Sequence, residues 1–260
     1  MEKILDNTFR GKRTLLCLKI FLILMVVMML LGYSVWNMAN GQMVQNPDAP
    51  MAMSMLLLIL GIAFVGFALS ITIIVMAVHW ICWLFRSTQN MKKLQPDAMS
   101  PWAATILCLI PFVGQIVHYF VFKSLIKRTQ AELDSLNGVC AAVPMNFLNI
   151  YFGLTIVSTI MGSIEEMKIV VGTGAVLGVA ALVLYIKVFT AYIAQEECLF
   201  KLHEEQVLRQ KVDQVLRERE IEKAASQVQA ATYESEKPSA EKSEGSTSYA
   251  DDAPPPPPEK

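Results

Sequence analysis

The sequence predicts an all-α membrane protein: a polytopic helical bundle followed by a charged C-terminal tail. Of its 260 residues, 54% are hydrophobic and 17% are charged, and the mean hydropathy is +0.43. Soluble domains usually contain about 25% charged residues. The deficit in charge, together with the long apolar runs described next, places the chain in the membrane class.

Five apolar runs follow one another along the chain. About 20 apolar residues cross a hydrocarbon core of roughly 30 Å. The first run is longer than the apolar core of a signal peptide and lacks a small-x-small cleavage pattern, so we expect an uncleaved span. The second exceeds what a bilayer needs, and we expect Trp80 and Trp83 near its interfacial end. The runs cover residues 15–36, 51–85, 101–122, 145–163 and 169–193.

The third run is ambiguous because Pro111 lies at its centre and Gly114 follows. Proline breaks a helix by removing a backbone donor and clashing with the preceding turn. Semi-polar side chains also recur on one helical face of this run. They are Thr105, Cys108, Gln115 and His118. The run is therefore either a fifth span or a Pro-broken segment that enters and leaves on one side, or lies in the interface.

Loop charges favour four spans with a re-entrant or interfacial third run. Five spans would export the segment 123–144, which carries Lys123, Lys127 and Arg128, together with the charged tail. Lys and Arg near spans are normally retained in the cytoplasm. With four spans, both termini face the cytoplasm, and the exported loops hold only Lys168 as a basic residue. Five spans remain the alternative.

Composition divides the chain into three parts. Residues 1–193 form the expected transmembrane domain, with 13 Lys/Arg and 8 Asp/Glu, whereas residues 194–260 carry 9 and 15. Residues 194–231 are rich in helix-favouring residues. Leu208, Val212 and Val215 fit a coiled-coil seam that Arg219 interrupts, so a solvated helix is the competing interpretation. Residues 232–260 have the composition of a disordered, Pro-rich tail.

No motif indicates catalysis, a cofactor or a metal, and no basic stripe indicates nucleic-acid binding. The five cysteines are scattered, and we expect them to act as small hydrophobic residues. They are Cys17, Cys82, Cys108, Cys140 and Cys198. The histidines are interpreted as packing or interfacial residues. Gly174 and Gly178 form a small-xxx-small pair that permits close helix packing, and supports dimerisation only weakly.

One block of the sequence is more specific. Trp83, Arg86 and Asn90 form a Trp-x-x-Arg-x-x-x-Asn pattern, followed by Ser-Pro-Trp at 100–102 and an apolar segment around Pro111. The block, which contains Pro101 and Trp102, resembles an uncharacterised family of bacterial multi-pass membrane proteins. The resemblance covers about residues 15–200 and implies helical architecture and an inner-membrane location. It implies no activity.

The chain departs from that family at two places. Gly114-Gln115 stands where the family often has Asn, and Phe147 and Tyr151 replace tryptophans at the start of the fourth run. Arg86 and Asn90 are four residues apart and therefore share a helical face. We expect Arg86 either to cap the carbonyl groups freed at Pro111 or to bind a lipid or ligand, and the block as a whole to be a structural clamp or a lipid contact.

These patterns predict a non-enzymatic membrane protein that acts through its cytoplasmic face as an interaction or assembly partner. The charges, the motif block and the tail are all expected on that face. The expected partners are the lipid bilayer, a cytoplasmic protein bound by the tail, and further copies of the chain. A small transporter or channel that uses the broken third segment is the alternative, and a membrane enzyme is a third hypothesis.

Overall fold

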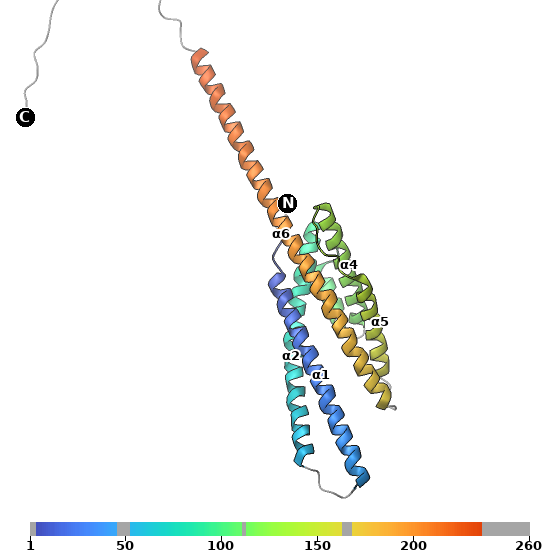
Figure 1. Ribbon diagram of the computed structural model, residues 1–260. Helices are drawn as coiled ribbons and strands as arrows, with labels where there is room; N and C mark the ends of the chain where they lie inside the picture. The colour runs from blue at the N-terminus through green and yellow to red at the C-terminus, as the bar shows by residue number, and fades with distance from the viewer. Residues whose placement is uncertain (1–3, 46–52, 111–112, 163–167, 236–260) are drawn as a thin grey trace, which may run out of the picture. The chain divides into compact units, whose positions relative to one another are not determined.

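The fold consists of helices joined by short connections (Figure 1). The computed structural model describes residues 4–45, 53–110, 113–162 and 168–235, and these residues include no strand. The all-α architecture is thus confirmed. The helices are α1 (Thr8–Gln45), α2 (Met53–Leu94), α3 (Pro101–Leu109), α4 (Val113–Ser135), α5 (Met145–Gly162) and α6 (Lys168–Ser235).

Four helices among the described residues are long and apolar enough to cross a membrane. The qualifying stretches are Thr8–Met38, Met55–Leu94, Met145–Gly162 and Gly172–Val228. They include four of the five predicted apolar runs and leave out the third. The chain is therefore an all-α membrane bundle with four candidate spans, as the loop charges predicted.

The third run is divided between α3 and α4. α3 has nine residues, so at about 1.5 Å per residue it is about 14 Å long and too short to cross a bilayer. Ile110 ends it in an extended conformation, with φ −71° and ψ 123°. A following proline favours that conformation because its ring clashes with a helical predecessor. Pro111 itself lies outside the described residues.

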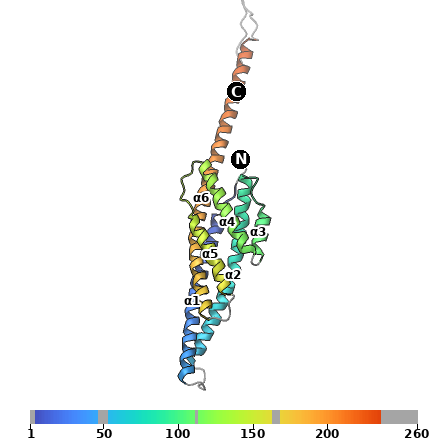
Figure 2. The same cartoon turned by 90° about the vertical axis from the view of Figure 1, so that its right-hand side faces the viewer.

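Gly114 allows α3 and α4 to approach closely after this break. A Cβ atom on Gly114 would lie 2.3 Å from the carbonyl oxygen of Cys108, a separation that no side chain tolerates. The Gly114 amide donates to the Ile110 carbonyl at 2.6 Å. Glycine is therefore required here for steric reasons, and the two helices form a hairpin beside α2 (Figure 2).

The chain divides into two units, Met1–Leu208 and Arg209–Lys260. The first unit extends beyond the expected boundary at residue 193, because Glu196, Leu199 and His203 are buried within it. In the second unit, residues 209–235 are helical and every residue from Arg209 to Val228 is exposed. The predicted disorder of the tail concerns residues 236–260, which lie outside the described residues.

Aromatic side chains fill the centre of the first unit. Trp83 of α2 lies edge-on to Phe189 of α6 with ring centroids 4.6 Å apart, and to Phe122 of α4 at 6.0 Å. All three are fully buried. Such edge-to-face pairs stabilise a core beyond the area that they bury. This cluster fixes α2, α4 and α6 against one another.

Candidate functional site

A buried polar cluster lies beside the aromatic core and is formed by Asn7, Trp83, Ser87 and Glu196. Glu196 accepts hydrogen bonds from the Ser87 hydroxyl at 2.6 Å, the Asn7 amide at 3.1 Å and the Trp83 indole at 3.1 Å. The Asn7 amide also lies within bonding distance of the Trp83 carbonyl. Burying a carboxyl group is unfavourable unless such donors replace water. The cluster satisfies that requirement from three separate segments.

Local helix geometry places these groups together. Trp83 and Ser87 are four residues apart on α2, so they share one helical face. Asn7 immediately precedes α1, whose first amide, that of Thr8, is capped by the Asp6 carboxylate at 2.8 Å. Glu196 lies on α6, one turn beyond the buried Tyr192. The cluster therefore joins the start of α1 to α2 and α6.

Asn90 holds the N-terminal segment by its backbone. Its side-chain oxygen accepts from the Leu5 amide at 3.0 Å, and its amide donates to the Leu5 carbonyl at 2.7 Å. The side chain thus satisfies both backbone groups of one residue. The motif block was predicted to be a structural clamp near Pro111 or a lipid contact, and Asn90 holds the N-terminal segment.

Arg86 shares the face of α2 that Asn90 uses, as the spacing predicted. Its Nε atom is buried and has no hydrogen-bond partner among the described residues. No contact between Arg86 and the carbonyl groups of α3 or α4 is found in the described part of the chain. The hypothesis that Arg86 caps the break in the third run thus gains no support.

The other predicted motif residues have separate roles. Trp83 lies in the core with no exposed surface, and its expected depth near the membrane interface stays a prediction. Pro101 occupies the first turn of α3, where its missing amide costs nothing. Trp102 is 67% exposed and packs edge-on against Phe85 at 4.9 Å. Pro111 lies outside the described residues.

Gly174 and Gly178 lie where α6 meets α5. A Cβ on Gly174 would lie 3.3 Å from the Cβ of Met161, and one on Gly178 would lie 3.1 Å from the Ser158 hydroxyl. That hydroxyl donates to the Gly174 carbonyl at 2.8 Å. The pair therefore serves packing within the chain between two neighbouring helices.

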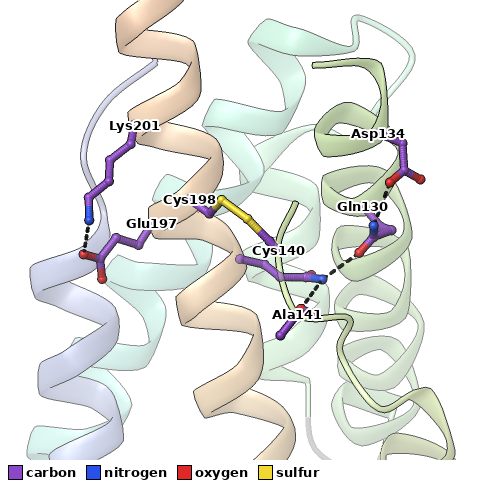
Figure 3. Close-up of a disulfide and its surroundings, with 8 residues drawn as sticks. Gln130, Asp134, Cys140, Ala141, Glu197, Cys198 and Lys201 are labelled. Carbon is purple, nitrogen blue, oxygen red and sulfur yellow. Dashed lines mark hydrogen bonds and ion pairs between the residues drawn. A yellow bond between two sulfur atoms is a disulfide. The ribbon is translucent and has the colours of Figure 1, made fainter. Parts of the chain in front are cut away.

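Two cysteines differ from the expectation. Cys140, in the connection after α4, forms a disulfide with Cys198 of α6 (Figure 3). Beside it, the Gln195 amide donates to Gln130 at 2.7 Å and to the Ala141 carbonyl at 3.0 Å. The interpretation of all five cysteines as free hydrophobic residues was wrong for this pair. Cys17, Cys82 and Cys108 are free.

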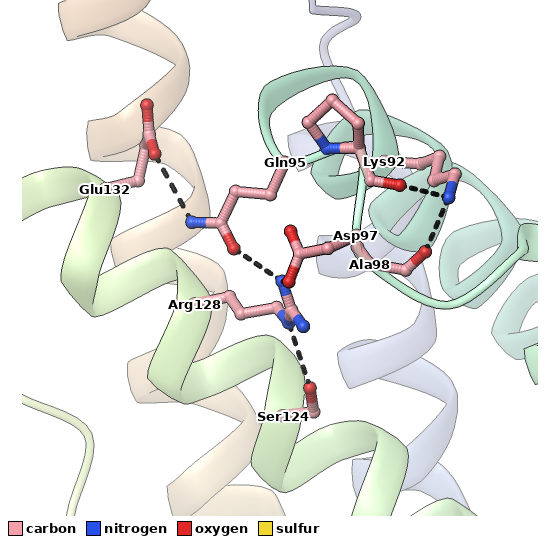
Figure 4. A network of polar contacts seen from close by, with 8 residues as sticks. Lys92, Gln95, Asp97, Ala98, Ser124, Arg128 and Glu132 are labelled. Atoms are coloured by element: carbon pink, nitrogen blue, oxygen red, sulfur yellow. Dashed lines mark hydrogen bonds and ion pairs between the residues drawn. The ribbon is translucent and has the colours of Figure 1, made fainter.

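Polar contacts also attach the connection after α2 to α4. Arg128 pairs with Asp97 at 3.0 Å and donates to Gln95 at 2.8 Å, while Gln95 donates to Glu132 (Figure 4). Lys92 donates to the carbonyl groups of Pro96 and Ala98. These contacts and the polar cluster link several segments into one connected region of the first unit. The segments lie around residues 5, 90, 97, 130, 140 and 198.

An open cavity of about 510 Å³ lies among the helices of the first unit. Its walls include Trp80, His118, Tyr151 and Tyr185, and the others are apolar residues together with Thr155, Ser158 and Thr159. The His118 ring stands edge-on to Trp80 at 5.0 Å. Nδ1 of His118 is buried without a hydrogen-bond partner among the described residues. Neutral imidazole offers one donor and one acceptor.

Comparisons with known proteins identify no relative. No family model, no curated protein and no solved structure matches the chain. The resemblance to an uncharacterised bacterial family thus stays a hypothesis that depends on the motif block.

Proposed function

We propose that the chain is a non-enzymatic, multi-pass protein of a bacterial cytoplasmic membrane that binds a partner protein through its cytoplasmic charged helix. The observation that carries this proposal is the exposed helical part of the second unit. It combines a high density of charge with apolar side chains that a solvated helix does not need. A partner helix or groove would cover them.

The apolar side chains of this segment form a short stripe. Val212, Val215 and Leu216 are about half exposed, and at 3.6 residues per turn they share one face with Leu208. Ile221, which is 69% exposed, falls on the opposite face. The stripe is too short for a long coiled coil, and fits a single helix-sized contact.

The cytoplasmic placement is supported by the distribution of basic residues. The connected region that contains Asn90, Arg128 and Cys198 also includes Lys92, Lys93 and Lys127, whereas residues 37–50 contain neither Lys nor Arg. Basic residues beside spans are retained on the cytoplasmic side. The disulfide argues in the opposite direction, because such bonds persist chiefly in oxidising compartments.

A pull-down with a truncated chain tests the proposal. The cut belongs after Leu208, because removing residues 194–208 would delete Glu196 and His203 from the first unit and damage the bundle itself. Removal of residues 209–260 should abolish capture of the partner set, and Val212→Glu with Leu216→Glu should do the same. Ile221→Glu is the matched control on the other face. A partner set unchanged by the truncation would count against the proposal.

A small transporter or channel is the second candidate. The observation that favours it is the break between α3 and α4 beside the cavity that His118 lines, because broken helices commonly line substrate paths. Solute flux into liposomes containing the full chain tests it. An effect of His118→Phe on such a flux would support transport, and a flux that neither His118→Phe nor Gln115→Ala alters would weaken it.

A further inference from the structure

The outward side of the α3–α4 hairpin is apolar and uncovered among the described residues. Its six large side chains are 49% to 67% exposed, and residues 101–122 contain no Asp, Glu, Lys or Arg. At 3.6 residues per turn, those on each helix share one face, and Gln115, which is also exposed, lies on another face of α4. Apolar patches of this kind mark contacts with protein or membrane. This outward face consists of Trp102, Ile106 and Leu109 on α3, and Val113, Ile116 and Phe120 on α4.

Both ends of the hairpin lie on the same side of the bundle. Asp97, which precedes α3, pairs with Arg128 of α4 at 3.0 Å, and Gln95 accepts a hydrogen bond from the same guanidinium group at 2.8 Å (Figure 4). A run that crossed the bilayer would separate these residues by the roughly 30 Å of the hydrocarbon core. The chain therefore enters α3 and leaves α4 on one side of the membrane.

Contacts with α2 fix the level of the hairpin's open end. Trp102, at the start of α3, packs edge-on against Phe85 at 4.9 Å, and Phe122 of α4 packs edge-on against Trp83 at 6.0 Å. On α2 the apolar run ends at Phe85, and Arg86 follows. The open end of the hairpin therefore lies where α2 changes from apolar to charged residues, which is the pattern of a membrane surface.

The two arms of the hairpin have the length of half a bilayer. His118 stands against Trp80 at 5.0 Å, about one turn from the open end on both helices, so α4 continues beside α2. At about 1.5 Å per residue, Val113 lies about 14 Å from the open end along α4, and Ile110 lies about 12 Å from it along α3. Half of a hydrocarbon core of roughly 30 Å is about 15 Å. The apex between Ile110 and Val113 thus fits the bilayer centre.

The backbone beside the break is compatible with such a depth. Non-helical backbone within the hydrocarbon region needs hydrogen-bond partners from the protein. The Ile110 amide donates to the Leu107 carbonyl at 3.4 Å, and the Gly114 amide donates to the Ile110 carbonyl at 2.6 Å. The ends of both helices therefore satisfy part of their backbone groups without water.

We propose that α3 and α4 form a re-entrant hairpin that inserts into one leaflet from the side of Arg86, with the outward face against acyl chains and the apex near the bilayer centre. Lipid is the occupant because the hairpin lies along α2, a candidate span, and its arms match half a bilayer. A flat interfacial position, the other expectation for this run, would place both helices only about 5–10 Å deep. The hairpin is separate from the charged helix of the second unit, so the inference extends the proposed function and does not rest on it.

Spin-label depth in phosphatidylcholine liposomes tests the proposal. Single cysteines are introduced on the outward face of an otherwise cysteine-free full chain. Collisions with oxygen, which concentrates at the bilayer centre, and with a nickel chelate, which stays in water, report the depth of each label. The label at residue 113 should lie about 12 Å deeper than the label at residue 102, with residues 106 and 116 between them. The variants are Trp102→Cys, Ile106→Cys, Val113→Cys, Ile116→Cys and Phe120→Cys.

Two exposed positions on α2 calibrate the depth. Cys82, which is a free and exposed thiol, is kept as the sole cysteine for the shallow reference, and Val75→Cys is the deep one. Because α4 runs beside α2, the label at Phe120→Cys should match the label at Cys82, and the label at Val113→Cys should match that at Val75→Cys.

A charge on the outward face provides a second test. Ile106→Glu places a carboxylate against acyl chains, where it is strongly unfavourable, and should move the label at Val113→Cys towards water. Val139→Glu is the matched control, because Val139 is an exposed apolar residue in the connection after α4, and it should leave that label in place.

Several outcomes would overturn the proposal. Labels that all lie within about 5–10 Å of the surface would indicate a flat interfacial segment. Spin–spin broadening at Ile106→Cys would show that a second copy of the chain covers the outward face. Met99→Cys and Ser124→Cys reacting with an impermeant maleimide from opposite sides of the liposome would indicate a fifth span. If Ile106→Glu does not fold, the depth profile of the cysteine variants still decides.

Discussion

Glu196 accepts a hydrogen bond from the indole nitrogen of Trp83 at 3.1 Å, although 113 positions separate the two residues in the sequence. This contact joins α2 to α6 within a cluster that also holds the start of α1. The carboxyl group has all its donors inside the protein. We therefore interpret Glu196 as a structural residue that stabilises the bundle.

Glu196→Ala should destabilise the first unit strongly. The substitution removes the acceptor of the Trp83 indole and of the Ser87 hydroxyl and one of the acceptors of the Asn7 amide, and a buried donor left unsatisfied costs about 1–3 kcal/mol. Thermal unfolding of the full chain in detergent measures this loss of stability. Glu197→Ala is the matched control, because Glu197 pairs with Lys12 and Lys201 at 2.9 Å on the surface and such pairs contribute at most about 1 kcal/mol. Equal losses of stability in Glu196→Ala and Glu197→Ala would contradict the structural role of Glu196.

Asn90→Ala should release the N-terminal segment without unfolding the bundle. It removes both hydrogen bonds to Leu5, each worth about 0.5–1.5 kcal/mol. Hydrogen exchange at residues 4–7 should accelerate, while exchange in the centre of α2 stays slow. Gln89→Ala, at the next position, should leave the N-terminal exchange rates unchanged. Slow exchange in both variants would show that other contacts hold this segment.

Gly114→Ala should disturb the hairpin of α3 and α4. The new Cβ would lie 2.3 Å from a backbone oxygen, so the backbone must move, and overpacking of this kind costs about 1–3 kcal/mol. Gly153→Ala is the control, since nothing lies within 4 Å of a Cβ there, and it should be neutral or slightly stabilising because alanine favours helix. Thermal unfolding of both variants makes the comparison. A Gly114→Ala variant as stable as Gly153→Ala would refute the close approach.

Cys140 and Cys198 should be thiols in growing cells if their end of the bundle faces the cytoplasm, where disulfides are rare. Their Cα atoms are 6.8 Å apart, so mild oxidation of the purified chain should join them. Alkylation of rapidly quenched cells, with Cys17, Cys82 and Cys108 replaced by alanine, reports their state. If Cys140 and Cys198 react with the alkylating reagent only after a reductant is added, they form a disulfide in the cell. That result would indicate an oxidising compartment and would contradict the proposed topology.

The helical membrane architecture could be predicted because it depends on local properties. Long apolar runs are visible in the sequence, and the break at residue 110 follows from the steric effect of Pro111 on its predecessor. The spacing of Arg86 and Asn90 likewise predicted a shared face. Which segment that face meets depends on how α2 is rotated in the bundle, and periodicity does not determine this rotation. Among the described residues, Asn90 therefore contacts Leu5.

The polar cluster and the disulfide depend on contacts between residues far apart in the chain, and a single sequence does not reveal such contacts. Asn7 and Glu196 are 189 positions apart, and Glu196 lies just beyond the last apolar run, where a carboxylate is unremarkable. Tryptophan is common at the membrane interface, and this tendency does not indicate whether Trp83 faces lipid or the core. Its burial results from the Phe122 and Phe189 rings and from the acceptor on Glu196, all of which come from distant helices.

The sidedness of residue 135 and of the C-terminus tests the proposed topology most directly. Ser135→Cys and a cysteine added after Lys260 would each be placed in a cysteine-free chain, with Asp48→Cys as the exported control. An impermeant maleimide applied to intact cells should label only the Asp48→Cys variant, and should label the other two after permeabilisation. Residue 135 and the C-terminus on opposite sides of the membrane would contradict the four-span account.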